Sequence, residues 1–281
     1  MMGATYFTFY TGVVLYAVAA VVAAAYLRRH EDFLLNAAFG IALAGALFLL
    51  GTFGLRIAAW HRLPLTTVTD SLNLFVVLST VVMIFVAKRG RLRSLLSFYL
   101  PPVALIAVLN AIMAHHFLGD EPRELQGEFL TFHVGLAFLA YALFFVASVT
   151  SVAYVFQANR LKHHQTLGLF QKLPPLERLD QLLFRLIKIG YPLFAITLIL
   201  GFIWAYVDRE LLGTHWWVAP KIVMAFLMAA FYSAAFHARR LGRLRGPKLA
   251  YFVFIGFGLL LVAHLILGFT QLNNYNFWGM H

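Results

Sequence analysis

The stretch FLTFHVGLAFLAYALFFVASVTSVAYVF, residues 129–156, decides the class of fold because it contains no Lys, Arg, Asp or Glu. A helix needs about 20 predominantly apolar residues to cross the hydrocarbon core of a bilayer, and this stretch exceeds that length. It also lacks the apolar–polar alternation of a membrane-barrel strand. The stretch therefore predicts a transmembrane helix, whose backbone hydrogen bonds are made within the segment.

Seven further stretches of the 281-residue chain have the same apolar character. They are residues 6–27, 33–55, 67–87, 95–115, 189–207, 218–236 and 249–272. The longest connection, residues 157–188, is too short for a soluble domain, and the first stretch is too long for a signal peptide and lacks a basic leader. We expect an all-α integral membrane protein with eight transmembrane helices in a single domain, residues 1–281.

The composition agrees with a membrane protein. Hydrophobic residues make up 62% of the chain and charged residues 12%, and the mean hydropathy is +0.82. A soluble domain of this size could not bury so many apolar side chains, which excludes a soluble enzyme. The chain has no cysteine, which excludes disulfides, iron–sulfur clusters and thiolate zinc sites.

Lys and Arg are unevenly divided between the two sides of the expected bundle. The connections after the first, third, fifth and seventh spans hold 17 of the 22, and the opposite side holds five. Because short cytoplasmic loops are enriched in Lys and Arg, we expect these four connections in the cytoplasm and both termini outside. The same rule accounts for the net charge of +11, so nucleic-acid binding is not expected.

The predicted topology divides the eleven histidines of the chain between the outer and the inner side. At outer ends of spans or in outer connections lie His61, His115, His116, His133, His215 and His281. At the inner side or within the last span lie His30, His163, His164, His237 and His264. A lone histidine or tryptophan at this depth usually anchors a helix at the interface. Two neutral imidazoles from different helices at one depth can instead ligate haem iron from both sides.

Two further patterns bear on function. No Lys, Arg, Asp or Glu lies near the middle of an expected span, which argues against an ion or proton pathway, and no buried acid–base pair supports a small-molecule enzyme. The cytoplasmic motif LPPLERLD, residues 173–180, begins an amphipathic turn. It predicts either a helix lying on the bilayer surface or a docking site for a soluble partner.

Five segments, in this order, resemble the cytochrome c assembly family, which includes the haem-handling proteins CcsA, CcmC and CcmF and a HemX-like and YpjD-like branch. The resemblance covers residues 56–281 and is closest to that branch. The segments are PLTTVTDS (64–71), FHVGLAFLAYALF (132–144), LPPLERLDQL (173–182), GYPLFAITLILGFIWA (190–205) and RGPKLAYFVFIGF (245–257).

The resemblance implies haem sites in this chain. His133 and His281 match the two outward histidines of the family, which hold a bis-histidine, b-type haem beside a tryptophan-rich connection. In this chain that connection carries His215, Trp216 and Trp217. His237 matches a family histidine associated with a second haem within the membrane, and His30 is a candidate partner by depth. The resemblance also implies the inner, cytoplasmic membrane of a bacterium.

One departure from the family concerns the tryptophan-rich platform. The chain keeps Gly213, Trp216, Pro220 and Lys221 of the family pattern. It has Val218 and Ala219 where the family has Trp and Asp. The change puts complete cytochrome c synthase activity in question more than haem binding, because binding needs the histidines and an apolar slot.

Three functions stay open at this stage. The first is a haem-handling protein that holds haem at the outer face. It would form no covalent bond itself, or would do so only with a cytochrome c assembly partner subunit. The second is a HemX-like regulator whose connection 157–188 acts on glutamyl-tRNA reductase, the committed step of haem synthesis. The third is a haem-bearing electron-transfer subunit, a class that carries paired histidines well inside helices, where this chain has His264.

The predicted topology can be tested because the chain has no cysteine of its own. A single cysteine inserted after Met1, or one replacing His281, should react with a membrane-impermeant maleimide in intact spheroplasts. A cysteine replacing Arg178 should react only after the membrane is opened. Protection of either terminus in intact spheroplasts would contradict this topology and the outer grouping of His133, His215 and His281.

Overall fold

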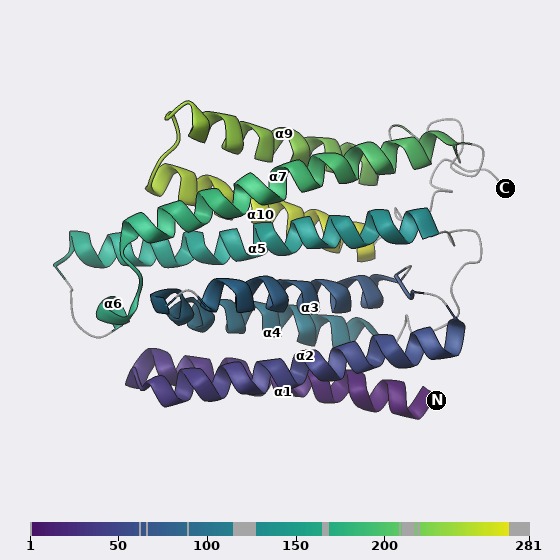
Figure 1. The fold of residues 1–281 in the computed structure, drawn as a ribbon, viewed down its shortest axis with the longest axis horizontal. Helices are drawn as coiled ribbons and strands as arrows, with labels where there is room; N and C mark the ends of the chain where they lie inside the picture. Colours follow the sequence, from purple (N-terminus) through teal and green to yellow (C-terminus); the bar gives the residue numbers. More distant parts are fainter. Residues whose placement is uncertain are drawn as a thin grey trace. The chain divides into compact units, whose positions relative to one another are not determined.

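The computed structural model describes residues 2–61, 63–65, 67–88, 90–114, 128–164, 169–207, 209, 217 and 220–269, and every regular element in these ranges is helical (Figure 1). The long helices are α1 (Met2–Arg29), α2 (Asp32–Trp60), α3 (Val68–Ala87), α4 (Leu96–Ala114), α5 (Glu128–Lys162), α7 (Leu176–Val207), α9 (Pro220–Arg240) and α10 (Pro247–Phe269). The short 3-10 helix η1 (Gly90–Leu95) precedes α4, and α6 (Leu169–Lys172) precedes α7.

Seven of the described helices are long and apolar enough to cross a membrane: α1 to α5, α7 and α9. Large apolar side chains on them are exposed, with Phe7, Val21 and Val207 between 66% and 71% exposed, as expected for surfaces that face lipid. The eighth predicted span coincides with α10, of which residues 247–262 count as a shorter apolar helix. The all-helical membrane architecture is confirmed, whereas the count of eight and the sides of the termini stay predictions.

The helices group into two units, which we describe separately. The N-terminal unit comprises Met1–Gln126 and Val152–Leu179, and the C-terminal unit comprises Gly127–Ser151 and Asp180–His281. Helix α5 contributes its first part to the C-terminal unit and its last part to the N-terminal unit.

In the N-terminal unit, α1 and α2 form an antiparallel hairpin in which Gly12 faces Gly45 at a close approach of the two backbones. A Cβ built on Gly12 would lie 3.1 Å from the backbone oxygen of Gly45, and one built on Gly45 would lie 3.2 Å from that of Gly12. The side chains of Leu49 and Tyr16 fill the space beside the two glycines. Because small residues let membrane helices approach closely, this glycine pair sets the distance between α1 and α2.

A chain of buried hydroxyl groups joins three helices of the same unit. The hydroxyl of Tyr16 on α1 lies 2.5 Å from Thr80 Oγ1 on α3, which lies 2.8 Å from the hydroxyl of Tyr99 on α4. Ser79 Oγ is 3.0 Å from the same Tyr99 hydroxyl. Each partner satisfies a polar group that lipid and apolar side chains could not, so these hydrogen bonds fix the register of α1, α3 and α4.

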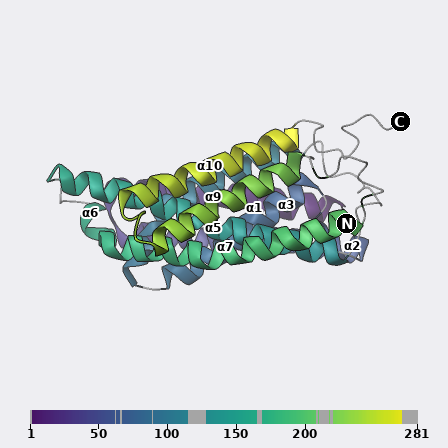
Figure 2. The ribbon, with the colours of Figure 1, turned by 90° about the horizontal axis from the view of Figure 1, so that it is seen from above.

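In the C-terminal unit, aromatic rings pack between α5, α7 and α9. The ring of Phe144 on α5 stacks on that of Tyr232 on α9, with centroids 3.5 Å apart, and meets Phe194 on α7 edge-on at 5.9 Å. Gly190 of α7 makes room for Phe144, since a Cβ there would lie 2.8 Å from its ring. Helices α9 and α10 form an antiparallel hairpin beside these rings (Figures 1 and 2).

Asp180, near the start of α7, anchors the connection between α9 and α10. Its carboxylate accepts hydrogen bonds from the guanidinium of Arg239 and, at 3.1 Å, from the backbone N–H of Gly246. The guanidinium of Arg239 also lies over the ring of Phe184, 5.4 Å from its centroid. One carboxylate therefore ties the α9–α10 turn to α7.

Helix α7 differs from the sequence expectation, which began the span at Ile189. The helix begins at Leu176 and runs unbroken to Val207, so LERLD, the second part of LPPLERLD, provides its first turn and is not a separate surface helix. The carbonyl of Pro175 accepts from the N–H groups of Arg178 and Leu179 and starts the helix. At 32 residues the helix is about 48 Å long, well beyond the ~30 Å hydrocarbon core.

Candidate functional site

His133 lies in the second turn of α5 and is half-buried in the C-terminal unit. Its imidazole points the Cε1 edge at Gly201 of α7, and a Cβ built on Gly201 would overlap the ring. Both ring nitrogens lie 3.1 Å from that Cβ position. The absence of a side chain at Gly201 therefore creates the notch that holds the imidazole.

The two ring nitrogens of His133 have different surroundings. The imidazole hydrogen-bonds to the backbone of Thr197, one turn before Gly201 on α7. The other nitrogen, Nδ1, is buried and has no hydrogen-bond partner among the described residues. In a neutral imidazole one nitrogen donates and the other carries a lone pair, so this arrangement leaves the lone pair of Nδ1 without a hydrogen-bond donor among the described residues.

This environment fits an axial ligand of haem. A metal-ligating histidine usually donates its second ring N–H to a carbonyl or carboxylate, as His133 can to Thr197. Among the residues described, no group of three or more His, Cys, Asp or Glu could hold a metal ion by itself. A haem iron already has four porphyrin nitrogens, so one or two imidazoles from the protein complete its coordination.

Aromatic rings pack at the α5–α7 contact, at positions of α5 that follow His133. Phe138 and Tyr141 of α5 meet edge-on with centroids 5.6 Å apart, and the Tyr141 ring lies 5.7 Å from that of Phe194 on α7. Phe138 and Phe194 are buried. These rings make this part of the α5–α7 contact aromatic and apolar, in the same unit as His133, and such a surface suits the face of a porphyrin.

Of the other predicted site residues, the structure describes His237, His30 and Trp217. His237 is exposed near the end of α9, where its ring packs on those of Tyr191 and Phe236, with centroids 6.2 and 5.1 Å away. Its candidate partner His30 belongs to the N-terminal unit. Trp217 is 58% exposed. His215, Trp216 and His281 lie outside the described residues, and so does the side chain of His264.

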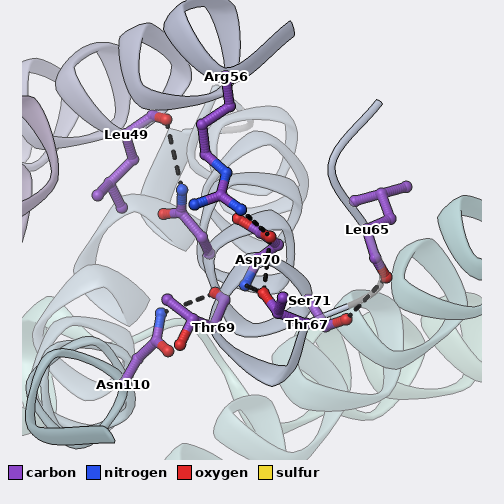
Figure 3. Close-up of polar contacts among 9 residues, drawn as sticks. Leu49, Arg56, Leu65, Thr67, Thr69, Asp70, Ser71 and Asn110 are labelled. Atoms are coloured by element: carbon purple, nitrogen blue, oxygen red, sulfur yellow. Dashed lines mark hydrogen bonds and ion pairs between the residues drawn. The ribbon is translucent and has the colours of Figure 1, made fainter. Parts of the chain in front are cut away.

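A second polar cluster, in the N-terminal unit, was not expected from the sequence (Figure 3). Arg56 of α2 donates to the Asp70 carboxylate of α3 at 2.9 Å, and these side chains are 5% and 3% exposed. The hydroxyl of Thr67 accepts from the N–H of Asp70 at 3.1 Å and donates to its carboxylate at 2.6 Å. Asp70 is thus held by an arginine and by the N-cap of its own helix.

Two asparagines connect this cluster to neighbouring helices (Figure 3). Asn110 of α4 donates to the carbonyl of Thr69 at 3.0 Å, and Asn73 of α3 donates to the carbonyl of Leu49 on α2 at 3.5 Å. The predicted topology places Arg56 and Asp70 at the outer ends of the second and third spans. The spacing Thr67-x-x-Asp70, a capping pattern, was the available signal that Asp70 belongs to a helix start.

Comparison with known proteins gives a consistent set of relatives. A sequence model described as cytochrome c assembly protein matches residues 65–272. The chain is 28% identical over 213 residues to Protein HemX of Bacillus subtilis (strain 168), covering 74% of each chain. It is 29% identical over 185 residues to Protein HemX of Brevibacillus brevis, covering 64% of this chain and 65% of the relative. It is 30% identical over 205 residues to cytochrome c biogenesis protein CcsA of Prochlorococcus marinus (strain MIT 9515), covering 63% and 65%.

The buried pair in the N-terminal unit predicts a specific pattern of stabilities. Asp70→Ala leaves the Arg56 charge buried without its partner, and it should destabilise the protein by about 3–5 kcal/mol. Asp32→Ala removes the carboxylate that pairs with Lys172 at 2.9 Å, where both side chains are largely exposed. That control should cost at most about 1 kcal/mol.

Unfolding in detergent micelles, followed by circular dichroism, measures both effects. The double variant with Arg56→Met and Asp70→Leu should recover most of the stability, because it removes both charges and keeps apolar volume. Equal melting temperatures for Asp70→Ala and Asp32→Ala would contradict this account of the buried pair.

Proposed function

Because the chain belongs to the cytochrome c assembly protein family, whose sequence model covers residues 65–272, we propose that it holds haem at its outer face as a haem-handling membrane protein. The observation that carries the proposal is the environment of His133. Its imidazole is seated against α7, bonded to the Thr197 backbone, and keeps a buried nitrogen with no partner among the described residues. A histidine that ligates a metal is expected to be oriented in this way, by a hydrogen bond from its second ring nitrogen.

Each participant has a defined role in this proposal. His133 and His281 would hold the haem iron in a bis-histidine, b-type site, and Trp217, Trp216 and His215 would lie beside the porphyrin. Phe138 and the neighbouring rings exclude water from the inner side. When bound, haem supplies an iron that changes oxidation state and exchanges axial ligands.

The proposal places the protein in the inner membrane of a bacterium, with its basic connections in the cytoplasm. The tryptophan-rich platform has Val218 and Ala219 where the family has Trp and Asp. We therefore propose that the chain holds or passes on haem and does not attach it covalently by itself. A cytochrome c assembly partner subunit would complete that reaction. His237, at the opposite end of the C-terminal unit, is the candidate ligand of a second haem.

His133→Ala should lower the haem content of the purified protein at least about tenfold, because an axial ligand contributes no less than the partners that orient it. Haem that remains should show a five-coordinate absorption spectrum. His281→Ala should change the spectrum in the same way. Absorption spectra before and after dithionite, with a haem assay for stoichiometry, measure both effects.

His163→Ala is the matched control, because His163 is exposed after α5 and lies outside the proposed site. It should keep the wild-type spectrum. If His133→Ala and His281→Ala both retain the wild-type spectrum and stoichiometry, the outer site is wrong. His237 and His264 would then be the next candidates.

The first turns of α7 favour a second candidate function, a membrane regulator of glutamyl-tRNA reductase. This segment buries Leu179, Leu182 and Leu186 and exposes the side chains of Arg178 and Arg185. A helix that exposes arginines and is longer than the hydrocarbon core is suited to binding an acidic face of a soluble protein. The similarity to proteins named HemX, the branch in which such regulation is expected, supports this candidate.

Charge reversal tests the regulatory candidate. The double variant with Arg178→Glu and Arg185→Glu should recover much less glutamyl-tRNA reductase in a pull-down from detergent extract than the wild type does. The matched control reverses Arg28 and Arg29, two exposed arginines at the end of α1 on the same predicted side. Equal recovery by both double variants and the wild type would leave this segment of α7 without a partner role.

A further inference from the structure

Gly201, a residue of α7 without a side chain, lies at the contact between α5 and α7. We propose that Gly201 is a positioning residue for His133, an inference that rests on the proposed haem function. Gly201 seats the imidazole and exposes the acceptor that orients it. Two observations support this: the notch that the ring occupies, and the hydrogen bond from the ring to the backbone of Thr197.

Helix geometry links these two observations. Thr197 and Gly201 are four residues apart in α7, so they lie on the same face. In an α-helix the carbonyl of residue i accepts from the N–H of residue i+4 and keeps a second lone pair. A side chain at i+4 covers the helix surface over the preceding turn, which includes this carbonyl. Glycine at 201 leaves the Thr197 carbonyl open to the imidazole N–H.

A methyl group at position 201 would therefore act on His133 in two ways. It would overlap the ring, whose nitrogens lie 3.1 Å from the Cβ position, and it would shield the Thr197 carbonyl. The imidazole is the far end of a flexible side chain, so the ring would swing away while the helices stay packed. Gly201→Ala should thus disturb haem ligation without unfolding the protein.

Other glycines of the C-terminal unit have surroundings that differ from those of Gly201. Gly190 and Gly256 receive the carbon rings of Phe144 and Phe231, which need packing space and no hydrogen-bond acceptor. Gly135, half a turn after His133 on α5, has nothing within 4 Å of its Cβ position. Gly135→Ala is therefore the matched control for a glycine-to-alanine change in the same unit.

The first experiment tests the contact without haem. Because the chain has no cysteine, Gly201→Cys introduces a single thiol next to His133, whose ring the new Cβ displaces from the notch but whose backbone still faces position 201. A cysteine and a histidine in contact bind Cd²⁺ together, so Cd²⁺ should slow the alkylation of Cys at position 201 by N-ethylmaleimide in the detergent-purified apoprotein. The slowing should disappear when His133→Ala is added. Equal slowing with and without His133 would overturn the inference, whatever the protein does with haem.

The second experiment measures haem affinity and the absorption spectrum of the purified protein. Gly201→Ala should lower haem affinity about 10- to 100-fold, the range for groups that orient a metal ligand, and should shift the Soret band. Gly135→Ala should leave both unchanged, and melting temperatures should show that both variants fold.

Retained affinity and spectrum in Gly201→Ala, with haem lost in His133→Ala, would overturn the positioning role while the proposed function stands. Haem binding that does not depend on His133 would overturn both, and Cd²⁺ protection would then report the contact alone.

Discussion

The hydrocarbon core of a bilayer offers no hydrogen-bond partner to a backbone N–H or C=O, so each crossing segment must satisfy its backbone internally. This constraint explains why every regular element in the described part of the chain is a helix. It also weakens the usual force for bringing helices together, because lipid is as apolar as the side chains it would contact. Specific contacts must therefore fix how these helices meet. They include the Gly12–Gly45 crossing, the hydroxyl chain of Tyr16, Thr80 and Tyr99, and the Asp180 anchor.

The buried pair of Arg56 and Asp70 follows from the same constraint. Two charges in a poorly solvated environment are stable only when their geometry is good and their other hydrogen-bonding atoms are satisfied. Asp70 meets these conditions because it lies in the first turn of α3, where the helix dipole favours a negative charge and the Thr67 hydroxyl supplies a further hydrogen bond. The segment PLTTVTDS, which resembles a family signature, thus defines the start of α3 and ties it to α2.

Hydropathy was sufficient to locate most helices, because a span is long and uniformly apolar. The expected span 67–87 corresponds to α3, Val68–Ala87, and 95–115 to α4, Leu96–Ala114. Hydropathy missed the first turns of α7, since charged residues interrupt the apolar run there. The spacing of Leu179, Leu182 and Leu186 was nevertheless typical of an amphipathic helix. The Arg56–Asp70 pair and the notch for His133 depend on which residues of different helices face each other, and a single sequence does not contain that information.

Orienting a histidine at the end of a membrane span requires a hydrogen-bond acceptor on the neighbouring helix. Where two helices pack, the nearest acceptors are helix carbonyls, which side chains normally cover. A glycine one turn later uncovers such a carbonyl and also removes the group that would collide with the ring. In an exposed helix a glycine costs about 1 kcal/mol relative to alanine. In α7 the His133 ring fills the space, so packing offsets that loss. The glycine lowers the intrinsic stability of α7 but permits a directional hydrogen bond to the imidazole. The position of the imidazole is therefore fixed by the packing of α5 against α7 and not by the flexible His133 side chain alone.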